Sequence, residues 1–186
     1  VAIYRVSQPG NRISTIKAPD RQHDNPRFGD SLCFATSGHL FIGAPNSWVS
    51  KPHDGIGYIY SLVNSYSPKQ TARFQRKPPQ ISGLFGHDAF RLSNSRLLIF
   101  HTASDRKFKN DRGPRIVTVS SKGVAGTQLS ISSGSQLHYP ALLAPETVVV
   151  AEGERGAALK LVEYNVSTDT PTSRAVGVID GNSALI

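Results

Sequence analysis

The chain has 186 residues, of which 38% are hydrophobic and 18% charged, and this balance indicates one ordinary globular fold with a core of its own. No window approaches the roughly 18 consecutive apolar residues of a transmembrane helix, so we expect no membrane span. The 16 Gly and 12 Pro favour short strands joined by turns over long helices. The net charge of +8 is compatible with a nucleic acid, an anionic glycan or an acidic protein as partner.

The first strands are expected close to the N-terminus. Residues 1–7 have the character of a strand, and residues 12–17 alternate in the manner of a second, outer strand. The connection 18–27 carries prolines and mixed charge, which argue against regular pairing. Because the chain begins at Val1 without Met, we expect a processed or excised piece of a longer protein.

The stretch 28–62 carries the clearest strand pattern. Its three apolar runs are short, rich in β-branched and aromatic residues, and separated by Gly-, Pro- and Ser-bearing breaks; they are residues 31–35, 39–45 and 57–62. The pattern recurs, because Phe85-Gly86 lies 57 residues after Phe28-Gly29. Residues 98–99 and 115–118 lie 57 residues after 41–42 and 58–61. Three features in one register predict a repeat protein.

The repeat divides the chain into units that we expect to be four-stranded. The expected divisions are 1–27 as the end of a preceding unit with its connecting loop, 28–83, 84–136 and 137–180 as full units, and 181–186 as the first strand of a further unit. The remaining strands are expected at 71–75, 116–120, 127–132, 139–143, 147–151, 158–164 and 174–180. Residues 161–162 lie 45 residues after 116–117, which predicts shorter loops in the last full unit.

A family resemblance rests on the first full unit. Phe28-Gly29, followed by Ser31 and by the run Gly43-Ala44-Pro45, resembles the FG-GAP repeat, which builds the β-propeller of integrin α-chains. The second unit keeps Phe85-Gly86 but has residues 100–102 in place of the GAP element, and the third keeps only the pattern. The resemblance implies an all-β fold, a β-propeller segment of about three to four four-stranded blades. It also implies ligand-contacting loops on one face and no chemistry, so we expect no enzyme.

The number of units bears on closure of the propeller. Propellers usually need about four to eight blades to close their ring. We therefore expect this segment to belong to a larger ring, completed by a second chain or by the rest of a longer precursor. A closed four-bladed ring is the alternative, although the first unit lacks the strand that would bridge the two ends.

No metal or cofactor is expected. Many FG-GAP repeats hold Ca²⁺ in an acidic loop, because a hard cation needs several converging oxygen ligands. The corresponding residues 35–39, 92–96 and 144–147 cannot cage calcium, and the six His show no metal-ligand spacing. The single cysteine, Cys33, excludes an internal disulfide framework, and we expect a buried free thiol there.

Two loops carry the candidate ligand-binding residues. The first loop, 46–55, holds the only tryptophan, and the second, 103–114, interleaves basic residues with a phenylalanine. The candidates are Trp48, Lys51, His53, Asp54, Arg106, Lys107, Phe108, Lys109 and Arg112. Exposed aromatics often anchor partners or sugars, and a basic loop with an aromatic can grip phosphates and stack a base. A solvated loop, with Asp105 and Asp111 paired to neighbouring cations, is the alternative.

Two functions are compatible with these features. The first is a non-enzymatic, adhesion-type module, extracellular or on the cell surface, that recognises a protein or a glycan through its rim loops. Asn165-Val166-Ser167 is a glycosylation acceptor that would then be used. The second is a structural subunit of a large intracellular assembly, a ribonucleoprotein included, that uses the basic surface. Nucleic acid is the less favoured partner, since runs of charge are non-specific.

Overall fold

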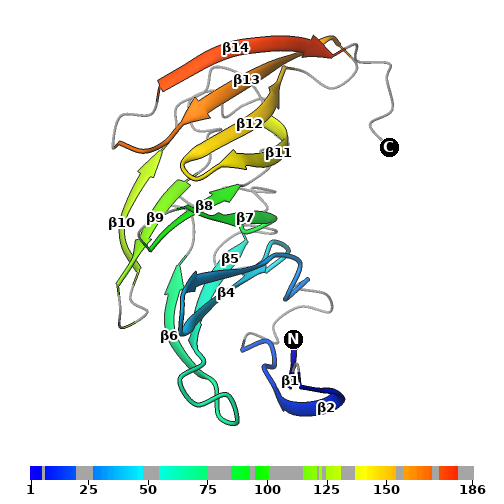
Figure 1. The fold of residues 1–186 in the computed structure, drawn as a ribbon, viewed down its shortest axis with the longest axis vertical. Coiled ribbons are helices and arrows are strands. Elements are labelled where there is room, and N and C mark those ends of the chain that lie inside the picture. The colour runs from blue at the N-terminus through cyan, green and yellow to red at the C-terminus, as the bar shows by residue number, and fades with distance from the viewer. Residues whose placement is uncertain are drawn as a thin grey trace.

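A computed structural model describes residues 1–5, 7–19, 27–47, 55–74, 85–92, 95–100, 115–120, 122, 125–130, 137–153, 157–168 and 172–179. Within these residues the protein is all-β, as the composition and the apolar runs predict, and contains no helix. A helix long and apolar enough to cross a membrane is therefore absent from the described residues. The sheets of the described residues form an open arc and not a closed ring (Figure 1).

Four antiparallel sheets make up the arc, and in each of them strands that are adjacent in sequence pair with one another. Sheet I consists of β1 (Ala2–Arg5) and β2 (Gln8–Thr15). Sheet II consists of β3 (Leu32–Thr36), β4 (His39–Ala44), β5 (Ile56–Ser61) and β6 (Lys69–Phe74). Sheet III consists of β7 (Asp88–Arg91), β8 (Arg96–Phe100), β9 (Arg115–Val119) and β10 (Ala125–Ser130). Sheet IV consists of β11 (Leu137–Ala144), β12 (Thr147–Glu152), β13 (Leu159–Asn165) and β14 (Thr172–Ile179).

The three apolar runs predicted as strands form β3, β4 and β5, and this prediction is confirmed. The second strand differs from its prediction, because β2 covers Gln8–Thr15 and not residues 12–17. Its start is determined by pairing with β1, in which Arg5 lies opposite Gln8. This pairing includes register shifts that carry Pro9 and Gly10 into the strand despite their low strand propensity.

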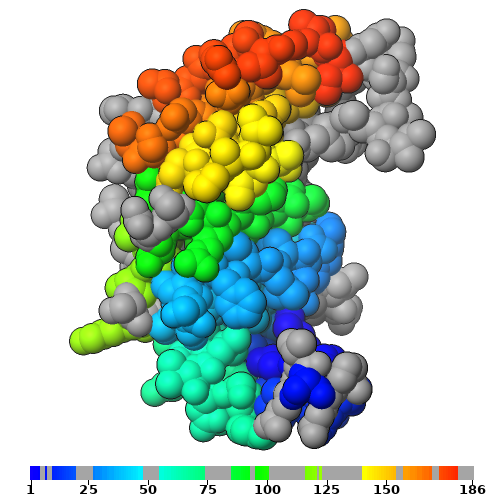
Figure 2. Space-filling model, in the orientation of Figure 1, coloured from blue at the N-terminus to red at the C-terminus, as the bar shows by residue number. Residues whose placement is uncertain are grey.

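The sheets follow one another along the arc as successive bands (Figure 2), and the apolar clusters between them show that they pack face to face. The first strands β7 and β11 lie toward the concave side of the arc, and the fourth strands β6 and β10 lie along its convex side (Figure 1). Strand β3 contacts β7, and β6 contacts β10, so sheets II and III meet along both their inner and outer strands. An apolar cluster fills each of the three interfaces between successive sheets.

Both faces of β4 and β5, the two middle strands of sheet II, are buried, which explains their strand pattern. In β4, Phe41 faces sheet III, whereas Leu40 and Ile42 face sheet I. Side chains alternate between the two faces of a strand, so a strand covered on both sides is apolar at every position. The continuous apolar run of β4 is the sequence signature of this double burial.

Residues 57 positions apart occupy equivalent places in successive interfaces. Gly29 and Gly86 have positive φ angles of 95° and 86°, a backbone conformation that Gly adopts without steric cost. The Gly29 N–H donates to the carbonyl of Gly43 at 2.9 Å, and the Gly86 N–H donates to the carbonyl of Phe100 at 3.1 Å. Each turn directs the phenylalanine before it into the space between two sheets. Phe28 packs in the I/II interface and Phe85 in the II/III interface.

The third unit has a different spacing from the one expected. Val117 pairs with Leu97 in sheet III, and Tyr164 pairs with Val148 in sheet IV. Leu97 and Val148 are both the second residue of the second strand in their sheets, so their partners Val117 and Tyr164 are equivalent. The third strands β9 and β13 are therefore 47 residues apart in sequence and not 45. The two-residue difference leaves every side chain on the same face, because the side-chain period of a strand is two. For that reason the apolar pattern alone does not detect it.

A pH-dependent contribution to stability arises beside the second Phe-Gly turn. His87 Nδ1 lies 2.8 Å from Asp88 Oδ2. This hydrogen bond raises the pKa of His87 above its ordinary value, against a smaller opposing effect of burial. The folded protein therefore holds the His87 proton more tightly than the unfolded chain does. The resulting stabilisation of the fold is fully present below the pKa of His87 in the unfolded chain, about 6.5, and is lost as pH rises through the raised pKa of the folded protein.

We expect His87→Gln to destabilise the protein at pH 5.5 by less than about 1 kcal/mol, since the pair is partly exposed. At pH 9 the difference from wild type should shrink to near zero. Urea denaturation at both pH values measures it, and a destabilisation that grows with pH would contradict the assignment.

Candidate functional site

Three turns lie at one edge of the stacked sheets, where the first strand of each four-stranded sheet leads into the second. Gly38, Ser95 and Glu146 occupy the same position in these turns. The carbonyl of Gly38 accepts a hydrogen bond from the Leu62 N–H at 2.7 Å. The carbonyls of Ser95 and Glu146 accept the corresponding bonds from Val119 at 2.7 Å and from Val166 at 2.8 Å. We call this edge the hairpin edge.

At the III/IV interface the hairpin edge is closed by an ion pair. Arg96, the first residue of β8, places Nη1 3.1 Å from Glu146 Oε2, and the same nitrogen donates to the carbonyl of Ser167 at 3.1 Å. The side chains of Arg96 and Glu146 are only 14% and 13% exposed. Arg96 Nη2 is buried without a hydrogen-bond partner. The bidentate capacity of the guanidinium is therefore only partly used.

At the II/III interface the equivalent positions carry different residues. His39 starts β4 as Arg96 starts β8, and Ser95 holds the place of Glu146. The His39 side chain is 5% exposed, and its Nδ1 lies 2.7 Å from Thr36 Oγ1. Among the residues that the structure describes, no side chain bridges the gap as Glu146 does at the next interface. A pocket of about 400 Å³ is left, lined by Thr36, Ser37, Gly38, His39, Val63, Arg91 and Ser95.

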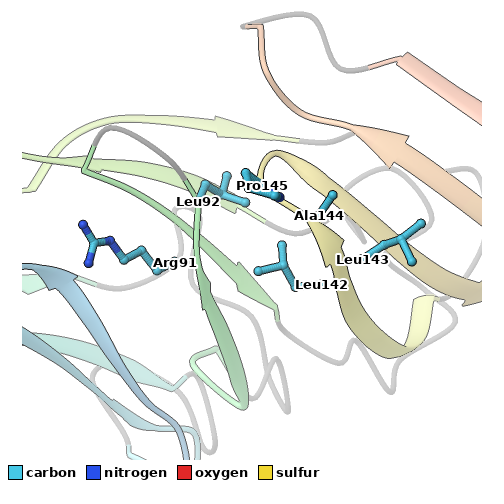
Figure 3. A pocket seen from close by; sticks show the side chains of 6 residues that line it. All are labelled: Arg91, Leu92, Leu142, Leu143, Ala144 and Pro145. Atoms are coloured by element: carbon cyan, nitrogen blue, oxygen red, sulfur yellow. The ribbon is translucent and has the colours of Figure 1, made fainter.

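A second pocket of about 300 Å³ lies at the III/IV interface, and Arg91 also belongs to its lining (Figure 3). Its walls are mostly apolar and are formed by Leu92 and by Leu142, Leu143, Ala144 and Pro145 of sheet IV. The guanidinium of Arg91 points away from Leu142 and Pro145, toward the strands of sheet II (Figure 3). The two pockets together, with Arg91 between them, are called the hairpin groove.

Cys33 lies on the inner strand β3, close to Arg91 of β7. It is a free thiol, half-buried, and packs against the II/III cluster. Burial raises the pKa of the Cys33 thiol, and a backbone hydrogen bond and the positive charge of Arg91 oppose this effect. A thiol with a raised pKa is protonated near neutral pH and is a poor nucleophile. The geometry thus gives Cys33 a packing role.

The ion pair at the III/IV interface permits a direct prediction. We expect Glu146→Gln to lower the free energy of unfolding by about 2 kcal/mol, because it leaves the largely buried Arg96 guanidinium with a neutral partner. Arg174→Gln is the matched control, since it breaks a pair of similar length with Glu163 in which the Arg174 side chain is 72% exposed, and its destabilising effect should be clearly smaller. Urea denaturation followed by circular dichroism measures both, and equal losses would contradict the prediction.

The nine ligand-binding candidates from the sequence all fall outside the described residues. They are Trp48, Lys51, His53, Asp54, Arg106, Lys107, Phe108, Lys109 and Arg112. The glycosylation candidate Asn165 is described and exposed at the end of β13. Its Oδ1 accepts hydrogen bonds from the Ser167 N–H at 3.0 Å and from the Ser167 hydroxyl at 2.7 Å.

Sequence reasoning missed the hairpin groove. A usable signal was present, because the 57-residue offset that aligns the Phe-Gly turns also aligns His39 with Arg96. The offset does not reveal that Arg96 pairs with a residue 50 positions away in the next sheet. The contrast between the two interfaces is therefore visible only after the sheets are stacked.

Groups of three or more His, Cys, Asp or Glu that could hold a metal ion are absent from the part of the chain that the structure describes. Comparison with known proteins adds no assignment: no protein-family model matches the chain, and no curated protein matches it.

Proposed function

We propose that the chain is part of an FG-GAP-like β-propeller that binds a partner and catalyses no reaction. Three successive four-stranded meanders, each packed on the next with its first strand toward the concave side, support the propeller arrangement. The repeated Phe-Gly turns support the FG-GAP relationship, since each combines a positive-φ glycine with a phenylalanine wedged between sheets.

One observation carries the proposal that further strands complete this arc. Leu32 and Phe34 of β3 are 50% and 54% exposed. Both pair with residues of β4 that face sheet I, namely Ile42 and Leu40. Within the described residues, sheet I has two strands, which cover the β4 and β5 side chains in this interface and leave the inner strand β3 uncovered. At the II/III interface, Ala89 of β7 takes the position of Leu32 and packs against the cluster.

An apolar surface of this kind is typical of an interface. We therefore assign the surface formed by Leu32 and Phe34 to contact with further sheets of the propeller. These sheets come from a second chain or from the rest of a longer polypeptide. The module as a whole then presents its edges and loops to a ligand, as binding propellers do.

The native mass of the purified chain tests this proposal. By light scattering after size exclusion we expect a mass well above the 20.1 kDa of one chain, or copurification of a second chain. Phe34→Glu should return the protein to a 20.1 kDa monomer, because a carboxylate in the contact is costly to desolvate. Tyr66→Glu, at a 65% exposed aromatic of the β5–β6 connection, is the matched control and should leave the mass unchanged. A folded, stable monomer of the unmodified chain would overturn the proposal.

The net charge of +8 favours an anionic or acidic partner. Secretion with a glycan on the exposed Asn165 fits an adhesion-type role, and mass spectrometry of the protein from a secreting host tests it. The alternative role is that of a structural subunit in an assembly that contains RNA. It rests on the same charge and predicts RNA binding that weakens steeply with salt.

A further inference from the structure

The hairpin edge has two equivalent positions between sheets. The position at the III/IV interface is filled by an ion pair, and the one at the II/III interface is an open pocket. At the III/IV interface, a basic residue at the start of the second strand meets the carboxylate of the next sheet's turn, in the pair Arg96–Glu146. At the II/III interface, His39 starts the second strand and Ser95 stands in the next turn. Serine is too short to reach across as glutamate does, and the pocket of about 400 Å³ remains.

The open site is equipped for an anion. Arg91 supplies a guanidinium whose head points toward sheet II (Figure 3). The polar residues Thr36, Ser95 and His39 line the same pocket. None of the described residues that line this pocket carries a carboxylate. Burying an acidic group here satisfies donors, whereas burying a cation would set like charges against each other.

The neighbouring apolar pocket decides what kind of anion fits. It begins on the other side of Arg91 and is walled by Leu92, Leu142 and Pro145, among others. Inorganic phosphate would use only the polar half of the groove. A nucleic acid would need basic groups repeated along its backbone, whereas the described residues that line the two pockets supply a single guanidinium, that of Arg91. A peptide that carries an acidic side chain beside an apolar one uses both halves.

We propose that the hairpin groove binds an acidic side chain of a protein partner, held by Arg91, Ser95 and the His39–Thr36 pair, with an adjacent apolar side chain in the pocket beside Leu142. This inference rests on the proposed binding function and names the chemistry of its partner. The acidic group takes the place that Glu146 takes at the next interface.

A synthetic peptide with the sequence of residues 142–147, Leu-Leu-Ala-Pro-Glu-Thr with blocked ends, is the probe. It carries the turn that fills the equivalent site, and its counterpart with Gln in place of Glu is the uncharged control. Titration of the ¹⁵N-labelled protein is expected to shift the amide signals of Gly38 and Ser95. The Glu peptide should bind about tenfold more tightly than the Gln peptide, the factor that corresponds to one favourable charged contact.

Two protein variants sharpen this test. Arg91→Gln should remove the preference for the Glu peptide, whereas Arg12→Gln, which makes the same charge change on exposed β2, should leave it intact. Ser95→Glu places a carboxylate at the position of Glu146 within the chain itself. It should abolish peptide binding and raise the urea midpoint above that of Ser95→Gln.

Equal affinity for both peptides, no binding at all, or no difference between the two Ser95 variants would overturn the inference. Competition by inorganic phosphate or by a short RNA as effectively as by the Glu peptide would also overturn it, since it would identify a general anion site. The mass measurement with Phe34→Glu is independent of the groove. If peptide binding fails while that variant still dissociates the assembly, the inference is wrong and the proposed function stands.

Discussion

Phe85→Ala is expected to lower the free energy of unfolding by about 3–5 kcal/mol, the range for deleting a fully buried aromatic side chain. Phe85 is 0% exposed and lies between sheets II and III, within the apolar cluster that includes Phe41 and Leu97. Both sheets are already formed by their own hairpins. The space left by the ring can therefore close only if one sheet moves against the other, and most of the cavity should persist.

Urea denaturation followed by far-ultraviolet circular dichroism measures this loss. Phe34→Ala is the matched control, because the same deletion at a 54% exposed position should cost less than about 0.5 kcal/mol in a dilute sample. The role of Phe85 as a wedge between sheets would be refuted by similar effects of the two substitutions. Phe28, its counterpart in the I/II interface, is only half-buried, and its replacement should cost less than that of Phe85.

The second large effect is expected at Gly43. A Cβ atom at this position would overlap the carbonyl oxygen of Gly86 and the hydroxyl of Ser31. Both atoms are constrained, because the Ser31 Oγ donates a buried hydrogen bond of 2.6 Å to that same carbonyl. The obstacle is mainly backbone and cannot rotate away. We expect Gly43→Ala to cost about 3 kcal/mol or more, at the upper end for overpacking.

Gly38→Ala is the control for Gly43→Ala. A Cβ there would lie 3.6 Å from Val63 Cγ2, an ordinary contact distance, and the expected change is below about 1 kcal/mol. Thermal and urea denaturation of both variants give the comparison. An unchanged urea midpoint for Gly43→Ala would show that sheets II and III do not approach as closely as the structure places them.

The residues of the Phe-Gly and GAP motifs, on which the family resemblance rests, form one packing contact. The Phe and Gly of the second unit, and the Gly that opens the GAP element of the first, meet in one place. Gly86 lies 3.2 Å from Gly43 when measured from the position of its would-be Cβ to the Gly43 Cα. The motif residues of two different units thus form a single contact between sheets. Side chains larger than hydrogen are excluded there for steric reasons.

The strands of the fold could be predicted from short-range pattern. In β4 and β5, every residue from Leu40 to Ala44 and from Ile56 to Tyr60 is buried, and continuous apolar runs bounded by Gly and Pro mark such strands. The 57-residue recurrence of the Phe-Gly turn predicted that the units repeat. Strands that are adjacent in sequence pair in every sheet, in line with the general preference of neighbouring strands for each other.

The candidate site could not be predicted in the same way. The nine loop residues chosen from the sequence were selected for their chemistry and lie outside the described residues. The hairpin groove depends on Arg91, His39 and Ser95, which belong to no recognisable local motif in the sequence. The sequence around Ser95 and Glu146 does not show that Glu146 bridges two sheets whereas Ser95 lines an open pocket.

Local residue pattern by itself therefore determined the all-β class, most of the strand positions and the repeat of the Phe-Gly turn. These features depend on side-chain alternation and turn chemistry, which act over a few residues. The stacking of sheets decided what they form together: the close approach of Gly43 to Gly86, the Arg96–Glu146 pair, the open pocket beside His39, and the uncovered side chains of Leu32 and Phe34. The first three features join residues about 50 positions apart in the sequence. The fourth is a sheet face that a further sheet would cover. Only the packing of one sheet on another brings such residues together, because no short-range propensity specifies which sheets meet.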